Sequence, residues 1–148
     1  MQLHTASAAS LSAFARGYPF VCGHNIIAHD LRYVHGSLPA QYLAIDTLCL
    51  SPLLFPMRPY HALVKDDKLQ SGTLNNPLND AMKARELFFD EYSAYRALPP
   101  ELRRIYCTLL GSTQQFHGFF RLVGERTAPD PVLAVRNFFQ GKICTHAP

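Results

Sequence analysis

Two short apolar runs in the first third of the chain each end at a polar residue, and helical patterns lie on either side of them. The runs Tyr18–Cys22 and Tyr42–Ile45 predict buried strands, because they are short, continuous and bounded by turn residues. Ser7–Ala15 predicts a helix before the first strand, and His29–His35 predicts a helix between the strands. Another helix is expected to follow the second strand as far as residue 54.

The rest of the chain is expected to be helical, apart from a proline-rich stretch and a polar loop. His61–Lys68 predicts one or two amphipathic turns. The clearest helix start lies at Pro77, which suits a first helical position, follows the potential cap Asn76, and precedes the first-turn charge Asp80. This helix should run to about Ala97. Three more amphipathic helices are expected over Glu101–Leu110, Gln114–Leu122 and Pro131–Phe139.

Composition favours a globular protein that does not enter a membrane. Apolar residues make up 48% of the 148 positions and charged residues 17%, which argues against disorder. A chain of this length is expected to form one compact unit that buries about 68–70% of its unfolded surface. It has no run of about 18 apolar residues and no signal-peptide pattern at its start, so we expect a cytoplasmic protein.

Cysteine spacing and charge add little to this picture. The four cysteines are far apart and form no Cys-x-x-Cys pair, so we expect reduced thiols rather than a zinc ribbon or a redox motif. The net charge of +3 comes from scattered basic residues, and it neither demands nor excludes a nucleic-acid partner.

The most informative stretch follows the first predicted strand and reads, from residue 21 to residue 31, VCGHNIIAHDL. It resembles the second acidic motif of the DnaQ-like, DEDD-type 3′-5′ exonucleases, in which a strand ends in Gly-His-Asn and the next helix aims a carboxylate at a pair of divalent metal ions. The resemblance implies that Asp30 is this carboxylate, and that His24 and Asn25 contact substrate.

A second match lies at the start of the long helix, where residues 75–81 read NNPLNDA. The family usually has His-x-Ala-x-x-Asp-Ala here, so the resemblance implies that Asp80 is the third acidic motif. Asn75 then stands where the family has its general-base histidine. Together, Asp30 and Asp80 are the implied catalytic and metal-ligating residues, and the implied cofactor is a pair of Mg²⁺ or Mn²⁺ ions, which carboxylates suit.

The resemblance covers roughly Ser10–Leu98. It implies an α/β fold, namely a partial ribonuclease H-like (DnaQ-like) mixed sheet with flanking helices, over residues 1–98, followed by an all-helical C-terminal extension over residues 99–148. Three further runs, DTLCLSPL at 46–53, YHALVKD at 60–66 and NNPLND at 75–80, narrow the resemblance to the exonuclease-like region ahead of the motor in some bacterial RecQ-type DNA helicases. The extension would then be a helical connector toward the motor.

One part of the family pattern does not occur in this sequence. The first acidic motif is an Asp-x-Glu on the opening strand, and no Asp-x-Glu, Glu-x-Asp or Asp-x-Asp is present. We therefore expect part of a metal-dependent 3′-5′ exonuclease that acts on nucleic acid, most simply DNA, is associated with a helicase, and is inactive alone. The alternative is a non-catalytic module that binds nucleic acid or tethers a helicase.

Each implied site residue also has an ordinary structural interpretation. Asp30 and Asp80 could be no more than charges at helix N-termini. Asn25 is expected to hold its turn through nearby backbone. Asp46 and Thr47 are expected to cap the helix after the second strand rather than to bind metal.

Other candidate functional residues have less support from the sequence. A zinc site from Cys22, His24 and His29 lacks a spaced fourth ligand. His61 is expected to be a cap or a contact, not a base.

Several phenylalanines could stack on bases, but their helical spacing favours packing: they are Phe116, Phe119, Phe120, Phe138 and Phe139. Scattered basic residues could follow a phosphate backbone, although a solvated face is the more ordinary interpretation: they are Arg103, Arg104, Arg121, Arg126, Arg136 and Lys142.

Overall fold

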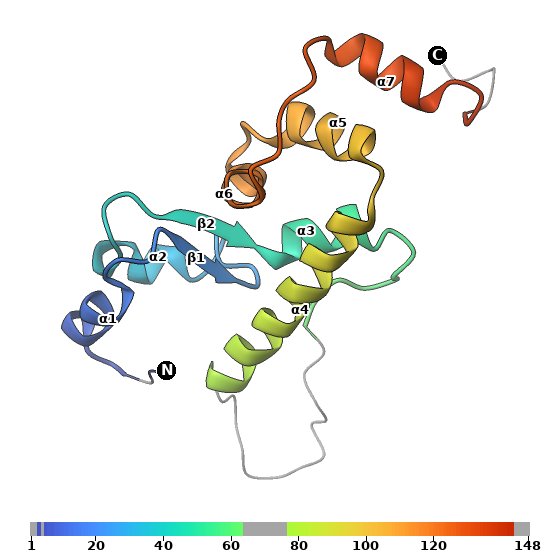
Figure 1. Ribbon diagram of the computed structural model, residues 1–148. Helices are drawn as coiled ribbons and strands as arrows, with labels where there is room; N and C mark the ends of the chain where they lie inside the picture. Colours follow the sequence, from blue (N-terminus) through green and yellow to red (C-terminus); the bar gives the residue numbers. More distant parts are fainter. Residues whose placement is uncertain (1–2, 4, 64–76, 144–148) are drawn as a thin grey trace.

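The computed structural model describes residues 3, 5–63 and 77–143 of the chain, and its elements follow the order expected from the sequence (Figure 1). The first half contains two strands with a helix before, between and after them. The elements are α1 (Ala8–Ala15), β1 (Phe20–Gly23), α2 (Leu31–Val34), the 3-10 turn η1 (His35–Ser37), β2 (Leu43–Asp46) and α3 (Thr47–Leu54).

The two strands form a small parallel sheet. Phe20 pairs with Leu43 and Gly23 pairs with Asp46, so both carboxyl ends lie at the same edge. The amide of Leu43 donates to the carbonyl of Pro19 at 2.8 Å, which starts the ladder. The turn after β1 and the start of α3 therefore lie side by side, and this edge is where the sequence motif falls.

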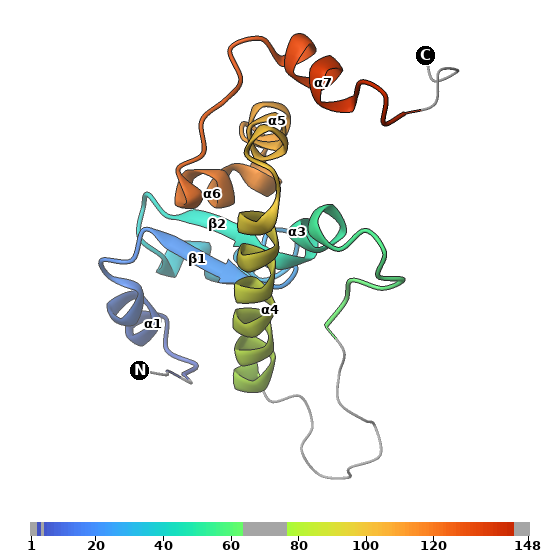
Figure 2. The same ribbon diagram turned by 45° about the vertical axis from the view of Figure 1, so that its right-hand side comes forward.

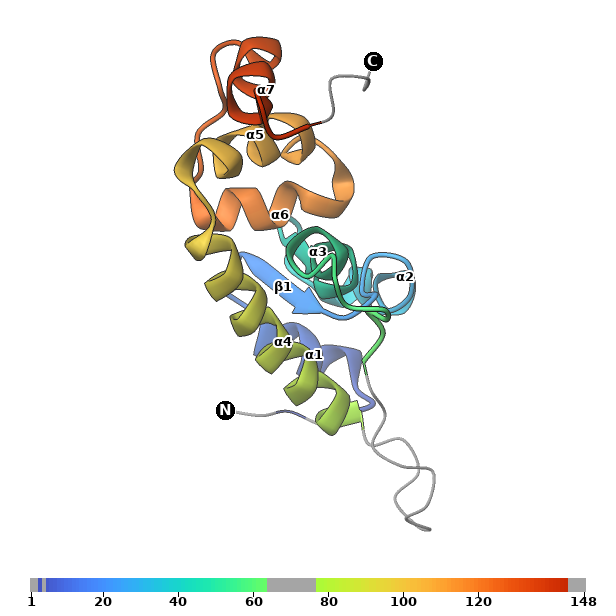
Figure 3. The same ribbon diagram turned by 90° about the vertical axis from the view of Figure 1, so that its right-hand side faces the viewer.

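The second half is entirely helical in the part of it that the structure describes. The helices are α4 (Pro77–Ala97), α5 (Pro100–Leu110), α6 (Gln114–Val123) and α7 (Pro131–Phe139). The long helix α4 packs against β1 and α3, and Figure 2 shows it running past the carboxyl ends of both strands. Helix α6 packs on β2, α5 stacks on α6, and α7 lies beyond α5, farthest from the sheet (Figure 3).

The hydrophobic core gathers side chains from β2 and from the helices around it. Its buried members are Ile45, Leu50, Tyr95, Cys107, Phe119 and Phe120. The Tyr95 and Phe119 rings meet edge to face, with centroids 5.1 Å apart and planes at 85°, a favoured aromatic geometry. Phe119 and Phe120 are core residues, as their helical spacing predicted, and this removes them from the candidates for base stacking.

The structure confirms most of the predicted elements and changes three details. The sheet within the described residues is purely parallel, not mixed, and by itself it does not establish a ribonuclease H-like fold. The helix expected over 29–35 is reduced to α2 and η1, because residues 26–30 form irregular turns first. Residues 61–63 are not helical, while the rest of the turn expected there, and the potential cap Asn76, lie outside the described residues.

Among the residues that the structure places, no helix has the length and apolar character needed to cross a membrane.

Candidate functional site

The Gly-His-Asn turn after β1 has a backbone that only certain residues can adopt. Asn25 has φ 60°, in the left-handed region, where asparagine is one of the few tolerated side chains. A Cβ added to Gly23 would lie 3.1 Å from the Ile26 side chain, so glycine lets the turn close tightly. Asn25 therefore serves the turn as expected, but through its backbone conformation.

The buried carboxylate of Asp46 holds this turn in place. Asp46 is 2% exposed, and it accepts hydrogen bonds from the backbone amides of Asn25 at 2.8 Å, Ile27 at 3.1 Å and Leu48 at 3.0 Å. The bond from Leu48 is the helix cap that the sequence predicted for α3. The other two bonds join the end of β2 to the turn after β1. Asp46 thus caps α3 and also ties the turn to the end of β2, and its hydrogen-bond partners within the described residues are backbone amides.

His24 connects three segments through both of its ring nitrogens. The amide of Leu63 donates to Nε2 at 3.2 Å, so Nε2 carries no proton. The neutral ring then has its proton on Nδ1, which donates to Thr47 Oγ1 at 2.9 Å, and Thr47 Oγ1 in turn donates to the carbonyl of Gly23 at 3.4 Å. Because both nitrogens are occupied, the structure gives His24 an architectural role, and its contact with substrate stays a prediction.

Asp30 and Asp80 line the same cavity, although they are fifty positions apart in the sequence. We call this space, of about 580 Å³, the turn cavity. Its walls come from the end of β1 and its turn (residues 22–26), from His29 and Asp30, from Ala62 and Leu63, and from the first turns of α4. The parallel pairing of the strands and the course of α4 bring these segments together.

The local setting of Asp30 leaves its carboxylate available. Asp30 occupies the cap position of α2 but makes no capping bond, and its side chain is 55% exposed. The ring of the adjacent His29 lies close to it, with Nδ1 3.5 Å from Oδ1. Such an oxygen donor, open to a cavity that also holds Asp80, suits a hard divalent cation.

The remaining ligands are not complete within the described residues. No group of three or more histidine, cysteine, aspartate or glutamate side chains in residues 3, 5–63 and 77–143 is arranged to hold a metal ion. Asn75, the expected counterpart of the general base, lies outside the described residues. The alternative zinc set of Cys22, His24 and His29 does line the turn cavity, but His24 has no free nitrogen to give.

One buried polar side chain was not predicted from the sequence. Glu91 of α4 is 0% exposed, and among the residues that the structure describes neither carboxylate oxygen has a hydrogen-bond partner. Burial and the nearby Asp46 carboxylate raise the pKa of Glu91 to about 8, against the opposing effect of Arg58. Nearby, Ser51 Oγ and His61 Nδ1 are 2.9 Å apart, so His61 makes a contact, as expected, rather than standing free as a base. A helical pattern alone gives no sign that Glu91 faces inward.

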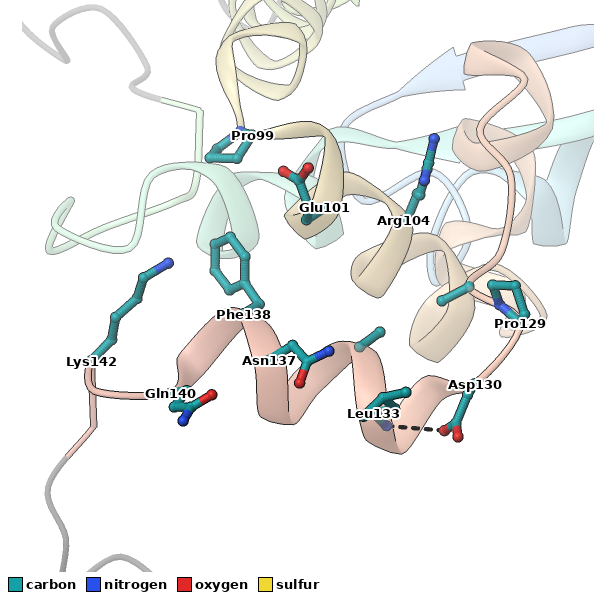
Figure 4. Close-up of a pocket in the computed structure, with 12 residues that line it drawn as sticks. Pro99, Glu101, Arg104, Pro129, Asp130, Leu133, Asn137, Phe138, Gln140 and Lys142 are labelled. Atoms are coloured by element: carbon teal, nitrogen blue, oxygen red, sulfur yellow. Dashed lines mark hydrogen bonds between the residues drawn. The ribbon is translucent and has the colours of Figure 1, made fainter.

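A cavity larger than the turn cavity lies elsewhere, between α5 and α7. This groove of about 720 Å³ is lined by Phe138 and Leu133 from α7 and by Glu101 and Arg104 from α5. Figure 4 shows the two helices on opposite sides of it, with Phe138 pointing toward the start of α5. Lys142 Nζ lies 3.7 Å from the centroid of the Phe138 ring. The groove mixes both signs of charge and contains none of the sequence motif.

One of the basic residues considered for phosphate binding, Arg103, does not lie on an exposed surface. Arg103 is largely buried, with Nε 3.6 Å from Glu125 Oε2, and Glu125 also accepts from the Tyr95 hydroxyl at 3.2 Å. This network joins α4 and α5 to the segment after α6. Arg103 is therefore part of the helical packing and not of a solvated phosphate-binding face.

Comparison with known proteins finds no matching family model, no matching curated protein and no matching solved structure.

Proposed function

We propose that the chain is part of a metal-dependent 3′-5′ exonuclease of the DnaQ-like class, in which Asp30 and Asp80 contribute to a Mg²⁺ or Mn²⁺ site. The observation that carries the proposal is that both aspartates line the turn cavity beside the Gly-His-Asn turn. Metal binding is suggested because both residues are carboxylates and because both lie in the sequence motifs described above. The resemblance to the region ahead of a RecQ-type motor extends the proposal to a DNA substrate and a helicase partner.

Two carboxylates are too few for the two-ion chemistry of this class, in which one ion generates hydroxide and the other stabilises the leaving oxygen. The sequence offers no Asp-x-Glu to complete the set. The proposal therefore includes little or no nuclease activity for this chain alone. Its own carboxylates would bind one ion weakly and place it at the cavity.

Mn²⁺ binding tests the proposal without requiring catalysis. Paramagnetic Mn²⁺ titrated into the labelled protein should broaden the amide signals around Asp30 and Asp80 first, because their carboxylates are the expected ligands. Asp30→Asn and Asp80→Asn should each remove this selective broadening, since a carboxamide keeps the shape but loses the charge. Asp90→Asn, on an exposed position of the same helix α4, is the matched control and should leave the broadening intact.

Broadening spread evenly over surface carboxylates, or unchanged in both site variants, would contradict the metal assignment. A parallel incubation with labelled single-stranded DNA and Mn²⁺ should show no digestion. Robust digestion that disappears in Asp30→Ala would show instead that the chain has a complete active site. DNA binding that persists in both site variants, without selective Mn²⁺ broadening, would favour the non-catalytic binding module.

A further inference from the structure

The short segment Tyr60–Leu63 separates the turn cavity from a neighbouring cavity. The second cavity, of about 440 Å³, lies against α3 and α4 and is lined by Ser51, Arg58 and Leu87 among others. Ala62 and Leu63 line both cavities. We call Tyr60–Leu63 the wall segment, because its position sets how the turn cavity is bounded on this side.

Two histidines supply the side-chain hydrogen bonds that hold the wall segment. His61, within the segment, contacts Ser51 Oγ through Nδ1 at 2.9 Å. His24, outside it, accepts the amide proton of Leu63 at Nε2, at 3.2 Å. These bonds respond differently to acid. The serine hydroxyl can accept a hydrogen bond from the N–H of a protonated His61, whereas a protonated His24 presents N–H to N–H and cannot accept from Leu63.

We propose that His24 is an acid-sensitive latch, which holds the wall segment against the turn cavity when its ring is neutral and releases Leu63 when the ring is protonated. The inference concerns how the cavity is bounded, and it does not depend on whether the cavity binds metal. Protonation leaves the bond from Nδ1 to Thr47 intact, because Nδ1 already donates in the neutral ring. Protonation therefore frees the wall segment, while the Gly-His-Asn turn keeps its bond to Thr47.

Several elements place charged or titratable groups near His24, and these groups influence its protonation. Asp46 lies at the end of β2, and its carboxylate favours the protonated ring. The groups that share the turn cavity are Cys22, His29, Asp30 and Asp80. The loss of solvent around the ring outweighs Asp46 and lowers the pKa of His24 below its usual 6.5. The latch is therefore closed at neutral pH and opens only on acidification below that value.

Two substitutions at position 24 separate the latch from the rest of the turn. His24→Gln places a carbonyl oxygen near the position of Nε2, so it can accept from Leu63 but cannot titrate. His24→Asn places an amide near the position of Nδ1, so it can reach Thr47 but not Leu63. His61→Asn is a further control, since it keeps a polar group near Ser51 and leaves His24 unchanged.

The measurement is the hydrogen-exchange protection factor of the Leu63 amide between pH 8 and pH 5, with His24 titration followed by its ring resonances in the same samples. In the unaltered protein the protection of Leu63 should fall by about tenfold or more as His24 takes up its proton. His24→Gln should keep Leu63 protected across the range, His24→Asn should lack the protection throughout, and His61→Asn should retain the acid response.

The proposal is overturned if Leu63 stays protected in the unaltered protein while His24 titrates, or if His24→Gln loses protection in acid as the unaltered protein does. The titration of the unaltered protein decides the question even if a variant fails to fold. Neither result bears on Mn²⁺ binding, so failure of the latch and failure of the metal site are distinguishable.

Discussion

At the scale of single residues, two buried carboxylates in this protein have opposite surroundings. Both oxygens of Asp46 accept hydrogen bonds, three in all from backbone amides, whereas within the described residues the oxygens of Glu91 have no hydrogen-bond partner. A buried carboxylate without hydrogen bonds is held more easily as the neutral acid. Asp46 therefore stabilises the turn through its three hydrogen bonds, while Glu91 weakens the fold whenever it ionises.

Glu91 should make the protein less stable as pH rises. In the unfolded chain its pKa is near the ordinary 4.5, and in the folded protein it is about 8. Between these values the folded state holds a proton that the unfolded state has released, so the free energy of unfolding falls with increasing pH. Glu91→Gln should raise the free energy of unfolding at pH 8 by an amount on the order of 2–4 kcal/mol, with little effect near pH 4.5.

Urea unfolding at several pH values measures this difference. Glu86→Gln, on an exposed position of the same helix, is the control and should leave the pH dependence as it is. If Glu91→Gln shows the same fall in stability between pH 4.5 and pH 8 as the unaltered protein, the pH dependence has another source.

At the scale of elements, helix α6 closes the outer edge of β2 by an unusually close approach. The amide of Leu43 points toward β1, so the polar groups of Ala44, the next residue in the strand, point away from it. Gly118 of α6 lies on that side, and a Cβ added to it would be 2.0 Å from the Ala44 carbonyl oxygen. Helix and strand can therefore approach only because residue 118 lacks a side chain.

Gly118→Ala should destabilise the protein by about 3 kcal/mol, because the added methyl group forces α6 away from β2. Alanine is the better helix former by about 1 kcal/mol, but the clash with a backbone atom outweighs this gain. Gly36→Ala is the matched control, since no atom lies within 4 Å of its added Cβ. Thermal unfolding of the two variants should give a large fall in Tm for the first and little change for the second, and equal shifts would show that α6 does not pack on β2 in this way.

At the scale of the whole molecule, the core does not stop at Leu98, where the family resemblance ends. Phe119 and Phe120 from α6 and Cys107 from α5 pack with Ile45 and Tyr95. Helix α7 differs, because it has no buried residue and leaves Val132 61% exposed. The last three helices therefore contribute differently to the core: α5 and α6 complete it, whereas α7 only packs against α5.

A chain ending at Leu98 should therefore fail to unfold cooperatively, since it lacks three of the six buried members of the core. A chain ending at Pro129, which lacks only α7 and the residues after it, should keep a cooperative transition with modest loss of stability. Near-ultraviolet circular dichroism during urea unfolding distinguishes the two, because it reports the packed tyrosine and phenylalanine rings. A cooperative transition in the shorter chain would show that residues 1–98 fold as an independent unit.

The sequence by itself determined the positions of most helices and strands, because these depend on local patterns. The proline at residue 77, the caps Ser7 and Asp46, and the short apolar runs each act over a few neighbouring positions. It also predicted that Asn25 holds its turn, although the left-handed backbone conformation of Asn25 became known only from the structure. The shortened α2 was missed because the hydrophobic pattern does not show that the amides of Asn25 and Ile27 bond to Asp46 and hold the preceding residues in turns.

Only the tertiary structure decided which polar groups meet. Strand pairing and the course of α4 place Asp30 and Asp80 on one cavity and bring Leu63 to His24. They also bury Glu91, which has no hydrogen-bond partner in the described part of the chain. Each of these contacts joins residues far apart in the chain, and its energy depends on solvent exclusion by several elements at once. A local pattern carries no information about such exclusion, so it can name a carboxylate or a histidine but not the charge that the folded protein allows it to hold.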